Sequence, residues 1–222
     1  MGGSSGFPID LVLFGMIALF LVLRLRSILG KRTGYEHPPQ PYMAPDAAGR
    51  GPTIDGRAEP APTPVNRVLP DPASPAGAAL LRMQEVDRKF SPPAFLDGAE
   101  KAFRMIVTAF AAGDRATLRN LLSDDTFHAF EAAVAAREAA GHRQRSEIRA
   151  IPSMAVETAA IAGTVATITV RFVSDQISLT VDGTGQPVSG TDAVTEITDL
   201  WSFERDLNKP DPAWRLVSAR SA

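Results

Sequence analysis

Apolar and polar positions change their spacing twice along this chain. An apolar run extends from Leu11 to Leu23 and is followed at once by Arg24 and Arg26. From Phe95 to Gly141, apolar residues recur every three or four positions, which is typical of amphipathic helices. From Glu147 onward they alternate with polar residues, which is typical of half-buried strands. The pattern therefore predicts a membrane-length segment, then helices, then a sheet.

The apolar run can span a thin bilayer when its flanks are included. Phe7 to Leu23 would form about 26 Å of helix. A cleaved signal peptide, which normally has a basic N-terminal region, and a soluble helix buried in a large core are the alternatives. We predict a membrane anchor over residues 1–32, with a helix over about 8–29. Its marker side chains are Leu11, Phe14, Ile17, Phe20, Leu23, Arg24 and Arg26.

The charges beside this run predict its orientation. Arg24, Arg26, Lys31 and Arg32 all follow the apolar segment, and no Lys or Arg precedes it. Because basic residues favour the cytoplasmic side, we expect a single-pass protein with its N-terminus outside and the C-terminal bulk in the cytoplasm.

A Pro-rich segment over residues 33–74 follows the predicted anchor. Pro recurs every few residues, and large apolar side chains are scattered singly. Such a composition cannot bury enough surface to offset its ordering entropy, so we predict a disordered or polyproline-like linker. A docking peptide for a partner is the alternative.

Order is expected to return at about residue 75. Ser74 and Pro75 are typical of a helix start, and Ser91-Pro92-Pro93 should stop this first helix. A longer helix should end at Gly113, and two more should begin after Asp114 and Ser123. Short connections between these helices favour an antiparallel cluster.

Strands are predicted in the remainder of the chain. A strand from Ile148 to Thr158 would be interrupted by Pro152, and Thr164–Ser174 is the clearest strand. Glu196 and Asp199 are expected to point mostly outward from a later strand. We predict one α+β domain over residues 75–222, with helices packed on an antiparallel sheet. Its expected core includes Phe103, Ile106, Phe110, Trp201, Phe203 and Trp214.

Composition narrows the function. A net charge of -2 argues against a general nucleic-acid binder, and the absence of Cys excludes thiolate chemistry and thiolate metal sites. His37, His128 and His142 lie far apart, and no phosphate-binding glycine loop or nucleophile motif is present. We therefore expect no enzyme activity, no metal and no cofactor.

One basic cluster is a candidate contact. Arg143, Arg145 and Arg149 lie in the sequence HRQRSEIR. They are interpreted either as a solvated turn between a helix and a strand, or as a contact with anionic lipid headgroups or an acidic partner.

Two stretches of the domain resemble the mitochondrial inner-membrane translocase subunit forty-four family. They are FLDGAEKAFRMIVTAFAAGDRATLRNLLSDDTFHAF and DLWSFERDLNKPDPAWRLVSAR. The resemblance extends from about Leu80 to the C-terminus. Its most specific residues are Trp201, Phe203, Arg205, Asp206, Asp211, Pro212, Trp214 and Leu216.

The resemblance implies a bacterial member of that family at the cytoplasmic face of the inner membrane. It implies helices on a curved antiparallel sheet, in a nuclear-transport-factor-two-like cone with an apolar pocket. It also implies a non-enzymatic adaptor or scaffold whose partners are proteins of translocation or membrane-protein biogenesis. A ribosome tether is an alternative, and nucleic acid would be contacted only through the ribosome.

A second hypothesis is a small-ligand pocket or an isomerase-like enzyme, because cone folds often host such sites. That chemistry typically uses a Tyr or an acid pair deep in the cone. Both tyrosines of the chain, Tyr35 and Tyr42, lie in the predicted linker.

Overall fold

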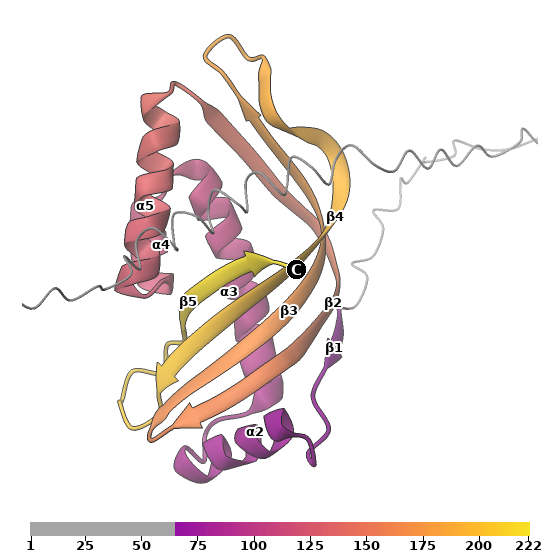
Figure 1. Cartoon of the computed structure of the whole chain (residues 1–222), viewed down its shortest axis with the longest axis vertical. Coiled ribbons are helices and arrows are strands. Elements are labelled where there is room, and N and C mark those ends of the chain that lie inside the picture. The colour runs from indigo at the N-terminus through magenta and orange to yellow at the C-terminus, as the bar shows by residue number, and fades with distance from the viewer. Residues whose placement is uncertain (1–64) are drawn as a thin grey trace, which may run out of the picture.

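The computed structural model describes residues 65–222, which form helices packed on a curved, mostly antiparallel sheet (Figure 1). The predicted anchor and most of the predicted linker lie outside the described residues. Within residues 65–222, no helix is long and apolar enough to cross a membrane. The elements are β1 (Asn66–Val68), α2 (Pro75–Val86), α3 (Pro92–Ala112), α4 (Arg115–Leu121), α5 (Asp124–Ala139), β2 (Arg143–Ala162), β3 (Val165–Val181), β4 (Pro187–Asp206) and β5 (Arg215–Ser221).

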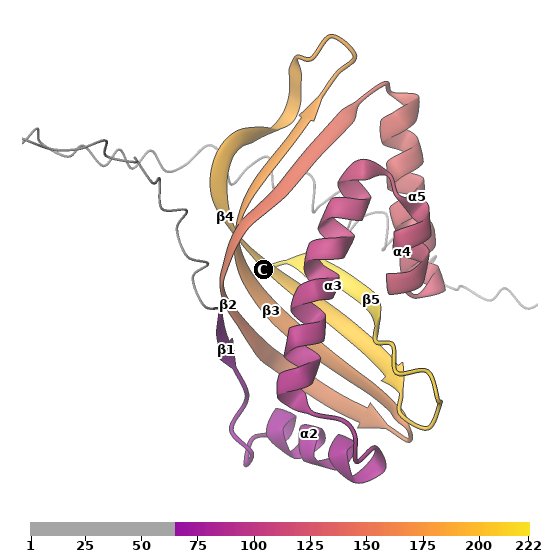
Figure 2. The ribbon, with the colours of Figure 1, turned by 180° about the vertical axis from the view of Figure 1, so that it is seen from behind.

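The sheet curves around α3, which runs along its concave side (Figures 1 and 2). Helix α2 lies across one end of α3, and α4 and α5 lie beside the other end. The strand order is β1-β2-β3-β4-β5, and every neighbouring pair is antiparallel except β1 and β2. The predicted α+β arrangement of helices on a sheet is therefore confirmed.

The start of the ordered chain differs from the prediction. Strand β1 lies within the range predicted to be linker and pairs in parallel with Ser153 to Ala155 of β2. Its Arg67 also forms ion pairs with Asp97 and Glu100 of α3, at 3.1 Å and 2.7 Å. The prediction from composition missed this strand because a three-residue edge strand is stabilised by pairing with the rest of the sheet, not by its own apolar side chains.

The helix starts follow the predicted caps. Ser74, Asp114 and Ser123 each accept a hydrogen bond from a backbone N–H in the first turn of the following helix. The sequence Ser91-Pro92-Pro93 was expected to stop a helix, but it begins one: Ser91 caps α3, whereas α2 already ends at Val86. A proline fits this position because the first helical N–H has no partner within the helix.

The long strands bend at irregularities. Pro152 was expected to interrupt a strand, but it lies within β2 at a shift of register between Ala150 and Ser153, where a missing N–H is tolerated. The pairing of β3 with β4 has a further shift of register between Gln176 and Ser178 of β3. Gly190 beside it has φ +79, and a Cβ there would lie 2.1 Å from the Ser178 carbonyl oxygen, so only glycine fits.

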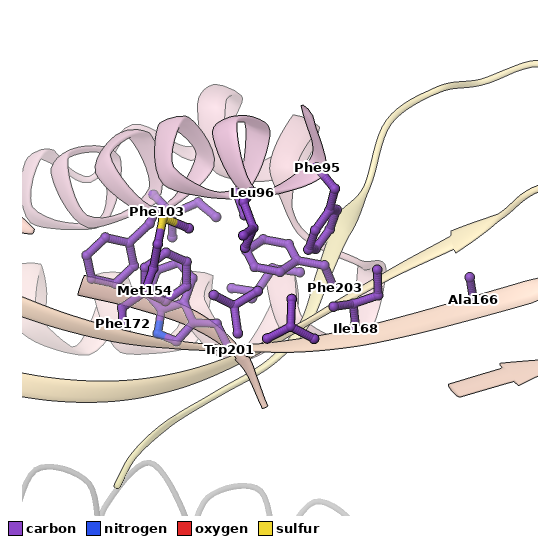
Figure 3. Close-up of a cluster of buried hydrophobic side chains, with 14 of the residues drawn as sticks. Phe95, Leu96, Phe103, Met154, Ala166, Ile168, Phe172, Trp201 and Phe203 are labelled. Atoms are coloured by element: carbon purple, nitrogen blue, oxygen red, sulfur yellow. The ribbon is translucent and has the colours of Figure 1, made fainter. Parts of the chain in front are cut away.

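The core lies between α3 and the concave face of the sheet (Figure 3). The Phe103 ring stacks on Phe172 at a centroid distance of 4.4 Å and meets Trp201 edge-on at 4.6 Å. Ile106 and Phe203 are also buried. The alternating side chains of β3 that the sequence assigned to one face, Ala166, Ile168, Val170 and Phe172, are all fully buried.

Two residues expected in this core are only half-buried, Phe110 and Trp214. Trp214 lies in the connection before β5 and packs on Phe90 and Phe95, at centroid distances of 5.7 Å and 4.8 Å. It therefore packs on the N-terminal end of the buried stripe of α3, about two turns before Phe103.

A partly buried ion pair joins the end of α2 to β4. Arg205 Nη2 lies 2.9 Å from Asp87 Oδ2, and the two side chains are only 13% and 14% exposed. The backbone N–H of Lys89 and the Arg205 guanidinium lower the pKa of Asp87 below its ordinary value. This contact links segments that lie 118 residues apart in sequence.

We predict that Asp87→Asn destabilises the domain by about 2 kcal/mol at pH 7, between the values for exposed and buried pairs. Because the folded-state pKa of Asp87 is lowered, its contribution is present above the unfolded pKa of about 3.9 and is lost as pH falls through the folded pKa. Urea unfolding at pH 7 and pH 3 measures this, with intrinsic fluorescence as the signal.

Both tryptophans of the chain, Trp201 and Trp214, lie in this domain, so the fluorescence of the full chain follows its unfolding. The exposed pair Arg119–Asp124 provides the control, and Asp124→Asn should change stability by less than about 0.5 kcal/mol. An Asp87→Asn penalty that is equal at both pH values would contradict the prediction.

Candidate functional site

A mostly apolar pocket lies between α3, α5 and the sheet. Its cavity volume is about 120 Å³. We call it the helix–sheet pocket; it is lined by Ile106, Val107, Phe110, Ala129, Phe130, Ala133, Gln144, Ser146, Gln176, Ile197, Asp199, Trp201 and Ala219.

Two helices supply the apolar wall of the helix–sheet pocket. Phe110 of α3 meets Phe130 of α5 edge-on, with ring centroids 5.1 Å apart. Ala129 and Ala133 lie one turn apart on α5, so their side chains fall on the same face. Because these two side chains are small, α5 leaves space between itself and the sheet.

The sheet supplies a polar wall. Gln176 Nε2 donates to Ser174 Oγ at 2.7 Å and lies 3.5 Å from Asp199 Oδ2. Ser221 Oγ donates to Asp199 Oδ1 at 3.4 Å. Asp199 is only 6% exposed, so a carboxyl group forms part of an otherwise carbon-rich cavity.

The expectation that Asp199 points outward is wrong. Side chains two apart on a strand share a face, and Asp199 is two residues from both Ile197 and Trp201, which line the same pocket. The alternation itself would have placed Asp199 inward. Glu196, one position out of phase with Ile197, is exposed as expected.

Arg137 of α5 links α3 and the sheet beside the pocket, a role that no sequence pattern indicated. Its Nη2 donates to the carbonyl oxygens of Phe110 and Ala111, at 2.7 Å and 3.2 Å. Its Nη1 donates to Gln144 Oε1 of β2. Burial lowers the pKa of Arg137 from its ordinary value, but a guanidinium still carries its charge at neutral pH.

The predicted basic cluster lies on the other side of the sheet. Arg143 and Arg145 belong to β2 and are exposed, whereas the intervening Gln144 lines the pocket, so these arginines point to the outer face. Glu147 pairs with Arg145 at 3.1 Å and with Arg149 at 2.9 Å. The cluster is thus strand surface, not a turn, and Glu147 offsets part of its charge.

The pocket can hold one apolar group of modest size. A cavity of about 150 Å³ lined by apolar side chains holds a benzene-sized molecule, whereas sites for drug-sized ligands are typically about 300–1,000 Å³. Within residues 65–222, no three His, Asp or Glu side chains are grouped to hold a metal ion. The geometry therefore fits an inserted side chain, next to a polar wall that carries Asp199 and Gln176.

A family model described as the Tim44-like domain matches residues 76–221, well over half of the chain. No curated protein sequence matches significantly. Among solved structures, the intermembrane space region of chloroplast protein ARC6 is similar, with a TM-score of 0.45 and 12% identity over 60% of this chain and 97% of that one.

Two bacterial proteins are more distant in structure. A putative dehydratase of the NTF2-like family from Streptomyces avermitilis gives a TM-score of 0.35 and 14% identity, over 59% of this chain and 96% of that one. A putative ketosteroid isomerase from Shewanella frigidimarina NCIMB 400 gives a TM-score of 0.26 and 11% identity, over 55% of this chain and 92% of that one. Similarities at this level have no bearing on activity.

We predict that Arg137→Met destabilises the domain by about 2–3 kcal/mol, because the carbonyl groups at the end of α3 lose a charged donor. Arg145→Met, on the exposed outer face of β2, is the matched control and should cost less than about 0.5 kcal/mol. Urea unfolding of the full chain, followed by tryptophan fluorescence, compares the two. Equal effects would show that Arg137 does not hold α3 and α5 together.

Proposed function

This chain belongs to the Tim44-like domain family, and from that premise we propose that it is a non-enzymatic adaptor that binds a protein partner beside a membrane. The observation that carries the proposal is the helix–sheet pocket. Its volume and apolar wall suit one side chain of a partner.

We further propose that Leu11 to Leu23 anchors the chain in a bacterial inner membrane. The N-terminus would lie outside and the folded domain in the cytoplasm, as the basic residues after the apolar run favour. Partners would then be proteins of the translocation or membrane-protein biogenesis machinery.

The outer face of β2 is a second surface with a role in this setting. Arg143, Arg145 and Arg149 would contact anionic headgroups or an acidic partner, at about 1 kcal/mol per charge near a membrane. A ribosome tether would use the same face, because ribosomal RNA is also anionic. Glu147 limits the strength of either contact.

A small-ligand or catalytic site is the second candidate function, and Asp199 is the observation that favours it. A carboxyl group within an apolar cavity is a typical feature of acid–base sites. The small volume of the pocket favours the adaptor, since it leaves little room for a substrate beyond one ring.

We predict that Ala133→Phe, which fills the pocket, abolishes partner recovery in cross-linking and mass spectrometry of intact cells. Ala135→Phe, on the exposed side of the same helix, should leave it unchanged. Fluorescence unfolding verifies that both variants fold. Recovery of small molecules or lipid without a protein partner would contradict the adaptor function.

The orientation of the proposed anchor in the membrane is tested separately. A reporter that is active only in the cytoplasm should function when fused after Ala222. Neutral replacements of Arg24, Arg26, Lys31 and Arg32 should reduce its activity, because they remove the charge bias. A reporter that is active only after export would overturn the proposed orientation.

A further inference from the structure

A second hollow lies along α3, distinct from the helix–sheet pocket. Its cavity volume is about 380 Å³. Ala94, Gly98, Ala102 and Met105 of α3 form one side, and the connection between β4 and β5, with Trp214, forms the other. The N-terminal half of α3 and the β4–β5 connection both lie in the lower half of the domain (Figure 2). We call this hollow the α3 groove.

The α3 side of the groove is open at Gly98. Gly98 lies inside α3, where glycine destabilises a helix relative to alanine, yet a Cβ at this position would meet nothing within 4 Å. Packing within the described residues therefore does not explain this glycine. Met105 is 45% exposed and Trp214 is half-buried, so apolar side chains border the groove on both sides.

Two exposed lysines lie at or beside the α3 groove. Lys89 lines it, and Lys101 lies one turn after Gly98 on α3. Both lysines are exposed, and neither forms an ion pair among the described residues. Arg205 also lines the groove; its Nη2 binds Asp87, while its buried Nε has no hydrogen-bond acceptor in residues 65–222.

We propose that the α3 groove binds an amphipathic helix of a partner protein that carries acidic residues beside its apolar face. This rests on the proposed adaptor function and assigns that function a second contact surface. The groove fits a helix because Ala94, Gly98 and Ala102 follow one another at four-residue steps, so a second helix can approach closely. From Ala94 to Met105 the wall is about 16 Å long, or three helical turns.

Charge complementarity selects the acidic partner. A carboxylate on the bound helix would accept from Lys89 in the groove or from Lys101 beside it. Leucine or aromatic side chains at helical spacing would meanwhile cover Met105 and Trp214. A basic helix would meet unpaired like charges along the same rim.

The test places the photo-reactive amino acid p-benzoylphenylalanine at Met105 in the full chain, in intact cells, and maps the adducts by mass spectrometry. The matched control position is Val188, which is 48% exposed on β4, far from the groove. We expect the Met105 probe alone to link to an acidic amphipathic segment of another protein.

Variants test the two features that define the groove. Gly98→Leu fills the open space at the α3 side of the groove with a better helix former and should lower the adduct yield at least tenfold, whereas Ala135→Leu on α5 should not. The double variant Lys89→Glu, Lys101→Glu should also lower it at least tenfold. Arg82→Glu, Arg220→Glu changes net charge equally at exposed positions outside the groove and should have little effect.

Each other outcome overturns the inference. Four of these outcomes are adducts of the Met105 probe with a second copy of this chain, with residues 1–64 of the same chain, with lipid, or with a basic segment of another protein. The fifth is an adduct yield at Met105 no higher than at Val188. A parallel probe at Phe130 reports on the helix–sheet pocket. A protein adduct at Phe130 without one at Met105 would refute the groove and retain the adaptor; no protein adduct at either position would refute both.

Discussion

The contact between Phe103 and the concave face of the sheet positions the rest of the described domain. The stacked rings of Phe103 and Phe172, with Trp201 edge-on, fix the depth at which α3 lies along β3 and β4. Helix α2 and the connection that bears Trp214 then cover one end of α3, where the pair Asp87–Arg205 joins the end of α2 to β4. A strongly bent sheet provides this concave face, and the shifts of register in β2, β3 and β4 are where its strands depart from regular pairing.

The helix–sheet pocket follows from how α5 is held. Arg137 ties α5 to the carbonyl end of α3 and to Gln144 of β2, so the helix stands beside the sheet without filling the space between them. Ala129 and Ala133 keep that space open. The polar residues Gln176 and Asp199 are accommodated because they bond to one another and to neighbouring hydroxyl groups.

Helix α3 thus presents two different surfaces. Ile106, Val107 and Phe110 face the helix–sheet pocket, whereas Ala94, Gly98 and Ala102 border the α3 groove. A rigid helix with one apolar cavity and one cation-rimmed groove suits an adaptor, which gains specificity from combining contacts. The arginines on the outer face of β2 form a third surface, separated from both by the thickness of the sheet.

Local sequence determined the helix starts at Ser74, Asp114 and Ser123 and the buried face of β3, because capping and alternation depend on neighbours in the chain. The same alternation, correctly phased, also predicts an inward Asp199, because this residue shares its face with Ile197 and Trp201; the outward prediction assigned it the wrong phase. Only the tertiary structure decided the pairing of β1, the reach of Arg205 to Asp87 and the clamp by Arg137. These contacts join segments that are distant in sequence, and their partners are selected by the packing of α3 against the sheet, which no local pattern specifies.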